Sequence, residues 1–186
     1  MCCYDGVYVP EPSARLIEHL ARRHAAFFRG LGLTLPERVI VEGRWAPKPG
    51  GLKTAVREHP FARLVPDFPP HFAQTACVFL TPAGLCSLHL LSEHLGRHPW
   101  YYKPVKCWMH PITLEGDRPP VLVLHDERTD PYRLPGYPGF VPRIFCGRTC
   151  PSGAPASLVL QEELAFLSQI AGRDLVRAAE DEHLAG

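Results

Sequence analysis

The residues that could do chemistry are concentrated in one stretch, residues 77–111. It contains three cysteines, Cys77, Cys86 and Cys107, and two of its histidines, His89 and His110, each follow a cysteine by three positions. Thiolates and imidazoles at short spacings are the ligands that zinc and iron prefer in proteins. The stretch therefore predicts a metal centre around which the fold is built.

Four further cysteines lie outside this stretch, namely Cys2, Cys3, Cys146 and Cys150. The total of seven is odd, so complete pairing into disulfides would leave one thiol over. The N-terminus has neither a basic region nor a long apolar region, so no signal peptide is expected. We therefore expect a cytoplasmic chain that uses its thiols for metal or redox work rather than for disulfides.

Composition narrows the classes of protein that this chain can be. With 20 Lys and Arg against 19 Asp and Glu, it has no general electrostatic attraction to nucleic acid or to anionic membranes. No window approaches the roughly 18 apolar residues of a membrane span. A length of 186 residues favours one domain, and 21 prolines favour short elements. We predict a single α+β domain over residues 1–186, proline-rich and irregular, with short helices and short strands around a cysteine metal site.

Several elements must position the cysteines. Apolar residues at helical spacing predict a helix over 13–29, capped by Ser13. Alternating β-branched residues predict a hairpin of strands 38–45 and 52–58, and the proline-rich residues 59–72 are expected to be loop. A short apolar strand over 75–80 would deliver Cys77. Cys86 would immediately precede a helix that Ser87 caps and Gly96 ends, where the free amides favour a thiolate.

The later part of the chain predicts fewer ligands. Residues 119–127 read as a strand that ends in His125, Asp126 and Glu127, a weak candidate for a metal-binding fragment. A C-x3-C pair joins Cys146 and Cys150 in a turn. An amphipathic helix is predicted over 157–171, with Leu160, Leu164, Leu167 and Ile170 facing inward and Gly172 as its end, and residues 177–186 are expected to be a frayed tail.

The order of the cysteine motifs resembles that of the cysteine-cluster family of zinc- or iron-chelating proteins (YkgJ type). The motifs are Cys2-Cys3, Cys77-Val-Phe-Leu, Gly84-Leu-Cys86-Ser-Leu, Lys103-Pro-Val-Lys-Cys107-Trp-Met-His-Pro111 and Cys150-Pro-Ser-Gly153. The resemblance covers most of the cysteines and their order, and does not extend to residues 11–75. Two features depart from the family pattern: the chain lacks a cysteine shortly before the double cysteine, and His110 occupies a position that is usually aromatic.

The resemblance implies a bound metal and names its ligands. By the matching motifs these are Cys3, Cys77, Cys86, Cys107 and Cys150, with Cys2 next. Four thiolates suffice for tetrahedral zinc or for a [4Fe–4S] cluster. An excess of thiols favours an iron–sulfur cluster, with a zinc or iron ion as the alternative. His89 and His110 could add nitrogen ligands or hydrogen bonds to the ligands.

The sequence is compatible with three functions. The first is a metal or iron–sulfur protein with redox or metal-dependent activity. The second is a structural zinc module whose surface serves a protein partner. The third is a thiol enzyme in which His110 activates Cys107, although no third residue is fixed to orient the histidine. No motif names a substrate.

Overall fold

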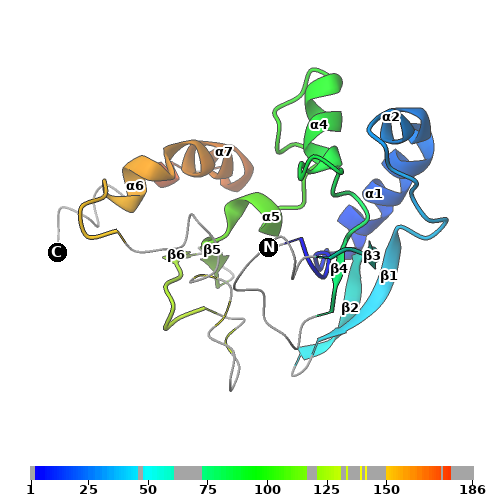
Figure 1. Ribbon diagram of the computed structural model, residues 1–186. Helices are drawn as coiled ribbons and strands as arrows, with labels where there is room; N and C mark the ends of the chain where they lie inside the picture. The colour runs from blue at the N-terminus through cyan, green and yellow to red at the C-terminus, as the bar shows by residue number, and fades with distance from the viewer. Residues whose placement is uncertain are drawn as a thin grey trace. The chain divides into compact units, whose positions relative to one another are not determined.

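The computed structural model describes residues 3–45, 48–60, 73–116, 121–130, 133, 139, 141, 150–172 and 174–176, with backbone alone at 44–45 and 48–49 (Figure 1). Its contacts fall into two compact units, Met1–Trp108 and Met109–Gly186. The expectation that the chain forms one domain stays a prediction. Within the described ranges, no helix is both long enough and apolar enough to cross a membrane.

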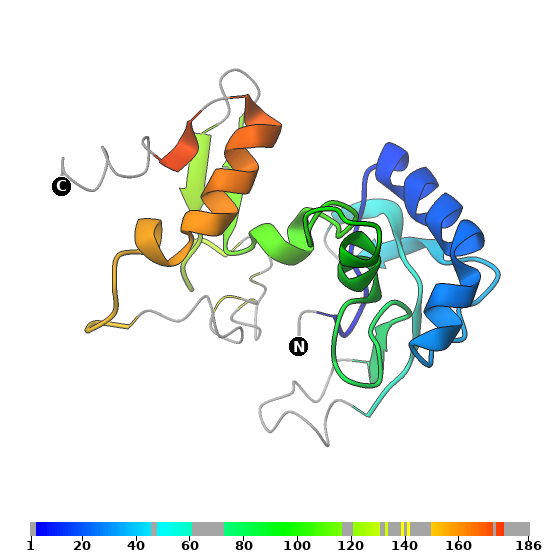
Figure 2. The same cartoon turned by 90° about the horizontal axis from the view of Figure 1, so that it is seen from above.

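The first unit begins with two short helices, α1 (Glu11–Arg23) and α2 (Ala25–Gly30), where one helix over 13–29 was predicted. The predicted cap at Ser13 is wrong, because α1 already starts at Glu11, after Pro10. A proline is well tolerated in the first helical turn, where its missing N–H would lack an acceptor anyway. The helix breaks at His24, and α2 continues beyond the bend (Figure 2).

The predicted hairpin is confirmed, and it consists of β1 (Ile40–Trp45) and β2 (Lys48–Thr54), paired antiparallel with Ile40 opposite Thr54. The predicted strand 52–58 is divided between two sheets. After Ala55 the chain leaves the hairpin, and β3 (Val56–Glu58) pairs with β4 (Thr75–Cys77). This second pairing places Val56 opposite Cys77, so the sheet fixes the position of that cysteine.

A turn then brings Cys86 back beside the end of β4. The N–H of Leu80 donates to the carbonyl of Cys77 at 2.9 Å, and Leu80 forms an isolated antiparallel bridge with Cys86. The predicted helix follows as α4 (Ser87–His94), but the predicted cap at Ser87 is wrong, because Cys86 is the N-cap residue. Gly96 comes two residues after α4, with a φ of 66°, a backbone conformation that glycine adopts readily. A single turn, α5 (Lys106–Met109), carries Cys107.

The core of the first unit lies between the two helices, the hairpin and α4. Its buried members are mostly aliphatic and aromatic: Val9, Ile17, Leu20, Phe28, Leu33, Val39, Ile40, Val78, Phe79, Leu88 and Leu91. The rings of Phe28 and Phe79 meet edge to face at 5.7 Å. Burial of this apolar surface is the main favourable term in folding the unit.

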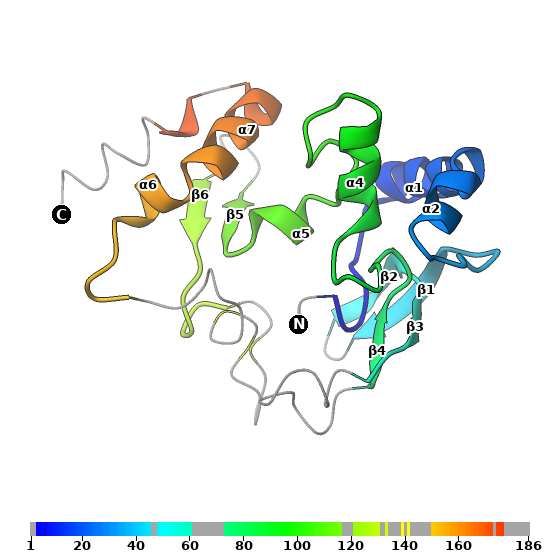
Figure 3. The same cartoon turned by 45° about the horizontal axis from the view of Figure 1, so that its top comes forward.

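The second unit contains a strand that the sequence did not reveal. β5 (Ile112–Glu115) pairs antiparallel with β6 (Val121–Leu124), and two helices follow, α6 (Ala156–Val159) and α7 (Gln161–Ala171). In Figures 2 and 3, α7 lies next to the β5–β6 hairpin. Gly172 ends α7 in the left-handed conformation, as predicted. The prediction for Ile170 is wrong, because its side chain is 60% exposed.

The predicted fold class is confirmed in its coarser form. The described residues form a mixed α+β structure with short helices and short antiparallel strand pairs. Within the part of the chain that the structure describes, each sheet has two strands. Such small sheets are stable only when a helix or another chain segment covers one face. The finer expectation, that a cysteine metal site organises the fold, depends on where the thiols lie.

Candidate functional site

Four cysteines line one pocket of the first unit. The pocket has a volume of about 480 Å³, and Cys3, Cys77, Cys86 and Cys107 all contribute to its wall. They come from four separate places: the N-terminal segment, the end of β4, the N-cap of α4, and α5. Among the described residues, none of the four forms a disulfide.

Backbone hydrogen bonds hold these cysteines in place. The N–H of Cys77 donates to the carbonyl of Cys3 at 2.7 Å, which joins the N-terminal segment to β4. The N–H of Ser87 donates to the carbonyl of Phe79 at 2.8 Å, so the start of α4 is fixed to the turn after β4. The N–H of Cys107 donates to the carbonyl of Pro104 at 2.8 Å.

The thiol of Cys77 is protonated at neutral pH. Burial raises its pKa to about 11, against a partial offset from its hydrogen bond to Thr54. Its Sγ donates to the Thr54 Oγ1 at 3.3 Å, and the same oxygen accepts the N–H of Val7 at 2.9 Å. A buried, protonated thiol behaves as a small apolar side chain. Because metals bind the thiolate, this environment works against a ligand role.

The prediction of a metal site is wrong. Within the described ranges, no group of three or more Cys, His, Asp or Glu side chains is placed so that it could hold a metal ion. The cysteines face a cavity of about 480 Å³ instead of converging on one point, and they are not gathered into a cluster. This finding contradicts three predictions: the iron–sulfur cluster, the zinc or iron ion given as its alternative, and the structural zinc module.

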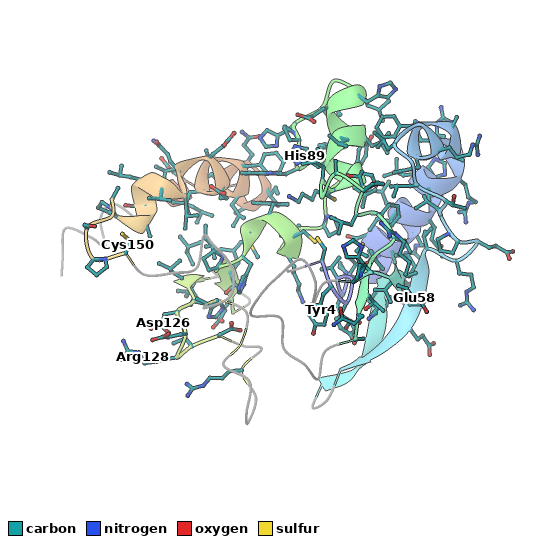
Figure 4. All side chains as sticks on the ribbon, viewed as in Figure 1. Tyr4, Glu58, His89, Asp126, Arg128 and Cys150 are labelled. Atoms are coloured by element: carbon teal, nitrogen blue, oxygen red, sulfur yellow. The ribbon has the colours of Figure 1, made fainter. Side chains whose placement is uncertain are left out.

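Among the described residues, His89 is the only other predicted ligand that lines this pocket. Cys150 belongs to the second unit, where it is exposed on the segment that leads into α6 (Figure 4). Cys2 and Cys146 lie outside the described residues. Of the two candidate histidines, His89 projects from α4 and lines the pocket (Figure 4). His110 belongs to the second unit.

Three charged or titratable side chains line the pocket besides the thiols. The Nε2 of His89 lies 3.7 Å from the Oε2 of Glu93, one turn further along α4. Lys103 is half-buried, and no carboxylate of the described residues forms an ion pair with it. In the sequence, Lys103 stands out only as the first residue of the motif that ends at Pro111. Its position four residues before Cys107, next to a proline, was the one available signal.

Apolar side chains form most of the remaining wall. They come from the N-terminal segment, the turn after β4, α4 and the segment before α5: Val7, Phe79, Leu80, Leu85, Leu88, Leu90 and Pro104. A mostly apolar cavity of a few hundred Å³ with a few polar groups is typical of sites that bind small molecules. The pocket is therefore the candidate functional site of the first unit.

The second unit holds a buried histidine, His125, beside a half-buried one, His110. The rings of His110 and His125 lie 6.4 Å apart, and His125 Nε2 lies 2.9 Å from the Thr113 Oγ1. Burial lowers the pKa of His110, against a partial offset from the buried carboxylate of Asp130. The neutral imidazole of His110 is therefore favoured there.

The carboxylate of Asp126, proposed above as part of a metal-binding fragment, stabilises a turn. Its Oδ1 accepts the N–H groups of Arg128 and Thr129, both at 2.8 Å (Figure 4). These hydrogen bonds lower the pKa of Asp126 to about 2. The residue thus has a local structural role that accounts for its position after β6.

Cys150 is expected to be the most reactive of the described thiols. Its pKa is lowered, chiefly by hydrogen bonding to the Ser152 side chain, with further bonds to backbone N–H groups. At pH 7.5, iodoacetamide should label Cys150 at least about tenfold faster than Cys77, because the thiolate is the attacking species. Peptide mass spectrometry measures both rates. Ser152→Ala should slow labelling at Cys150 alone, and equal rates at the two cysteines would contradict the assignment.

Comparison with known proteins does not assign the chain to a family. No family model matches the sequence, and no curated protein and no solved structure matches it. The resemblance to the cysteine-cluster family stays a prediction, without the metal site that it implied.

Proposed function

We propose that the unit Met1–Trp108 binds a small, mostly apolar organic molecule in the pocket lined by the four cysteines. The observation that carries the proposal is the pocket itself, whose volume is about 480 Å³. Pockets of about 300 to 1,000 Å³ hold small organic ligands in other proteins. The thiols then serve as part of an apolar wall, which agrees with the protonated state of Cys77.

The rigidity of the pocket's frame supports this function. Phe79 and Leu88 are 1% exposed and Leu91 is fully buried, so the turn after β4 and the inner face of α4 belong to the core. Leu85, by contrast, is 53% exposed although it lines the pocket. One wall of the pocket is thus held by the core, while another is open to solvent. A cavity that exists before binding avoids much of the free-energy cost of ordering the site.

Binding of a neutral apolar probe tests the proposal. We expect N-phenyl-1-naphthylamine to gain fluorescence with the wild-type chain. Leu90→Trp should fill part of the pocket and weaken probe binding by about tenfold, a loss that corresponds to about 1.4 kcal/mol. Leu95→Trp is the matched control, since Leu95 follows the same helix but does not line the pocket.

A second readout keeps the test independent of the folding of any variant. The probe should slow the alkylation of Cys107, which lines the pocket, and leave that of Cys150 unchanged. Absence of probe binding would overturn the proposal. So would tight binding that neither Leu90→Trp nor Leu85→Trp weakens, when circular dichroism shows both variants to be folded.

The thiol enzyme with Cys107 as nucleophile and His110 as base stays a prediction. The two residues belong to different units, Met1–Trp108 and Met109–Gly186. The pocket does not depend on that pair, because all of its lining residues lie in the first unit.

A further inference from the structure

The polar groups of the pocket indicate which charge its ligand carries. Three charged or titratable side chains other than the thiols line it: His89, Glu93 and Lys103. The carboxylate of Glu93 is already next to an imidazole, at 3.7 Å from the Nε2 of His89, and its side chain is about half exposed. Glu93 is thus placed toward water, with a partner on its own helix.

Lys103 differs from Glu93 in both respects. Its side chain is half-buried against an apolar cavity, and it has no ion pair among the described residues. Lys53, another lysine of the first unit, is compensated, since its Nζ lies 2.6 Å from Oδ1 of Asp5. An ammonium group beside apolar surface is stabilised when an anion pairs with it. The pocket therefore contains a positive charge that a ligand can neutralise.

The start of α4 adds positive potential on the same pocket. Cys86, the N-cap residue, makes no side-chain hydrogen bond to the first turn. Leu88 and His89, in that turn, both line the pocket. Amides of a first helical turn lack partners within the helix and favour negative charge nearby. The electrostatic potential from these amides is positive, like the charge of Lys103, and it is the smaller of the two.

We infer that the ligand of the pocket is an apolar molecule with one carboxylate group, and that Lys103 binds the carboxylate while Leu85, Leu88 and Leu90 contact the apolar part. This inference rests on the proposed function, because it concerns the same pocket. It excludes a neutral alcohol and an amine of the same chain length as good ligands. It also makes Lys103 the residue that determines specificity.

Displacement of the neutral probe by three eight-carbon ligands separates the possibilities. Octanoate, octan-1-ol and octylammonium share a chain and differ in charge. We expect octanoate to displace N-phenyl-1-naphthylamine at a concentration at least about tenfold below that of octan-1-ol, since hydrogen bonds between charged groups are stronger than those of a neutral hydroxyl. Octylammonium should be the weakest of the three.

Variants of two nearby lysines provide the control. Lys103→Gln should abolish the preference for octanoate and leave displacement by octan-1-ol unchanged. Lys106→Gln should preserve the preference, because Lys106 is exposed on α5 and does not line the pocket. Should Lys103→Gln fail to fold, wild-type protein in rising NaCl gives a second measurement, in which the advantage of octanoate falls while octan-1-ol is unaffected.

Each outcome has a separate meaning. Equal displacement by octanoate and octan-1-ol in the wild type overturns the inference and leaves the proposed function standing. A preference for octylammonium also overturns it and identifies Glu93 as the anchoring residue. A preference for octanoate that survives in Lys103→Gln removes Lys103 from the site. Failure of the probe itself to bind overturns the proposed function, and this inference with it.

Discussion

The first unit should lose about 2 kcal/mol of unfolding free energy between about pH 8 and about pH 10.5 through the titration of Cys77 alone. Burial raises the pKa of this thiol from 9.0 to about 11 in the folded chain. The folded state therefore holds its proton more tightly than the unfolded state does. Stability from this group is complete below about pH 9 and declines as the pH rises toward 11.

Urea unfolding followed by tryptophan fluorescence measures this loss. All three tryptophans, Trp45, Trp100 and Trp108, belong to the first unit, so the signal reports on that unit. Other groups titrate over the same range, and the comparison is therefore with Cys77→Ala, whose decline should be smaller by about 2 kcal/mol. Cys150→Ala should decline as the wild type does. A Cys77→Ala variant with the wild-type pH dependence would show that the thiol is not buried.

Local sequence signals predicted the elements that hold the pocket better than they predicted its chemistry. The strand that carries Cys77 and the helix that follows Cys86 both leave patterns within about ten residues: an apolar run, a serine before leucines at helical spacing, and a glycine after them. Such patterns depend on neighbouring residues, so a single sequence contains them.

The prediction of a metal site was wrong, and the reason is physical. Motif spacing indicates which cysteines the chain brings to one region, and four of them do line one pocket. It does not indicate where each Sγ points or whether the thiol is ionised. For Cys77 the deciding factor is burial in an apolar core, most of whose other residues are distant in sequence. Only the tertiary structure shows that this environment favours the protonated thiol.

Contacts between segments that are far apart in the chain could also not be predicted from the sequence. β3 pairs with β4, which lies well beyond it in the sequence, and β5 is only four residues long, too short for a clear alternating pattern. The division of residues 52–58 between two sheets at Ala55 has no local marker at all. A protein partner for this chain, and its cytoplasmic location, stay predictions for the same reason: no local pattern decides them.

Gly6→Ala is expected to destabilise the first unit by about 3 kcal/mol, combining the cost of a left-handed backbone with a steric clash. Gly6 has a φ of 71°, and a Cβ there would collide with both the backbone oxygen and the side-chain oxygen of Thr54. This close approach joins the N-terminal segment to β2. The N–H of Thr54 donates to the carbonyl of Val7 at 3.0 Å, and the N–H of Val7 donates to the Thr54 Oγ1.

The same substitution should weaken the pocket, because Gly6, Val7 and Thr54 line it and Thr54 holds the thiol of Cys77. Gly84→Ala is the matched control: Gly84 has a φ of 79° and also lines the pocket, but a Cβ there meets no atom within 4 Å. Gly84→Ala should lower the free energy of unfolding by only about 1 kcal/mol, which is the cost of the left-handed backbone alone. Urea unfolding compares the two variants, and probe fluorescence measures their affinities. Equal losses of stability would mean that the N-terminal segment does not pack against Thr54, so that one wall of the pocket would be missing in solution.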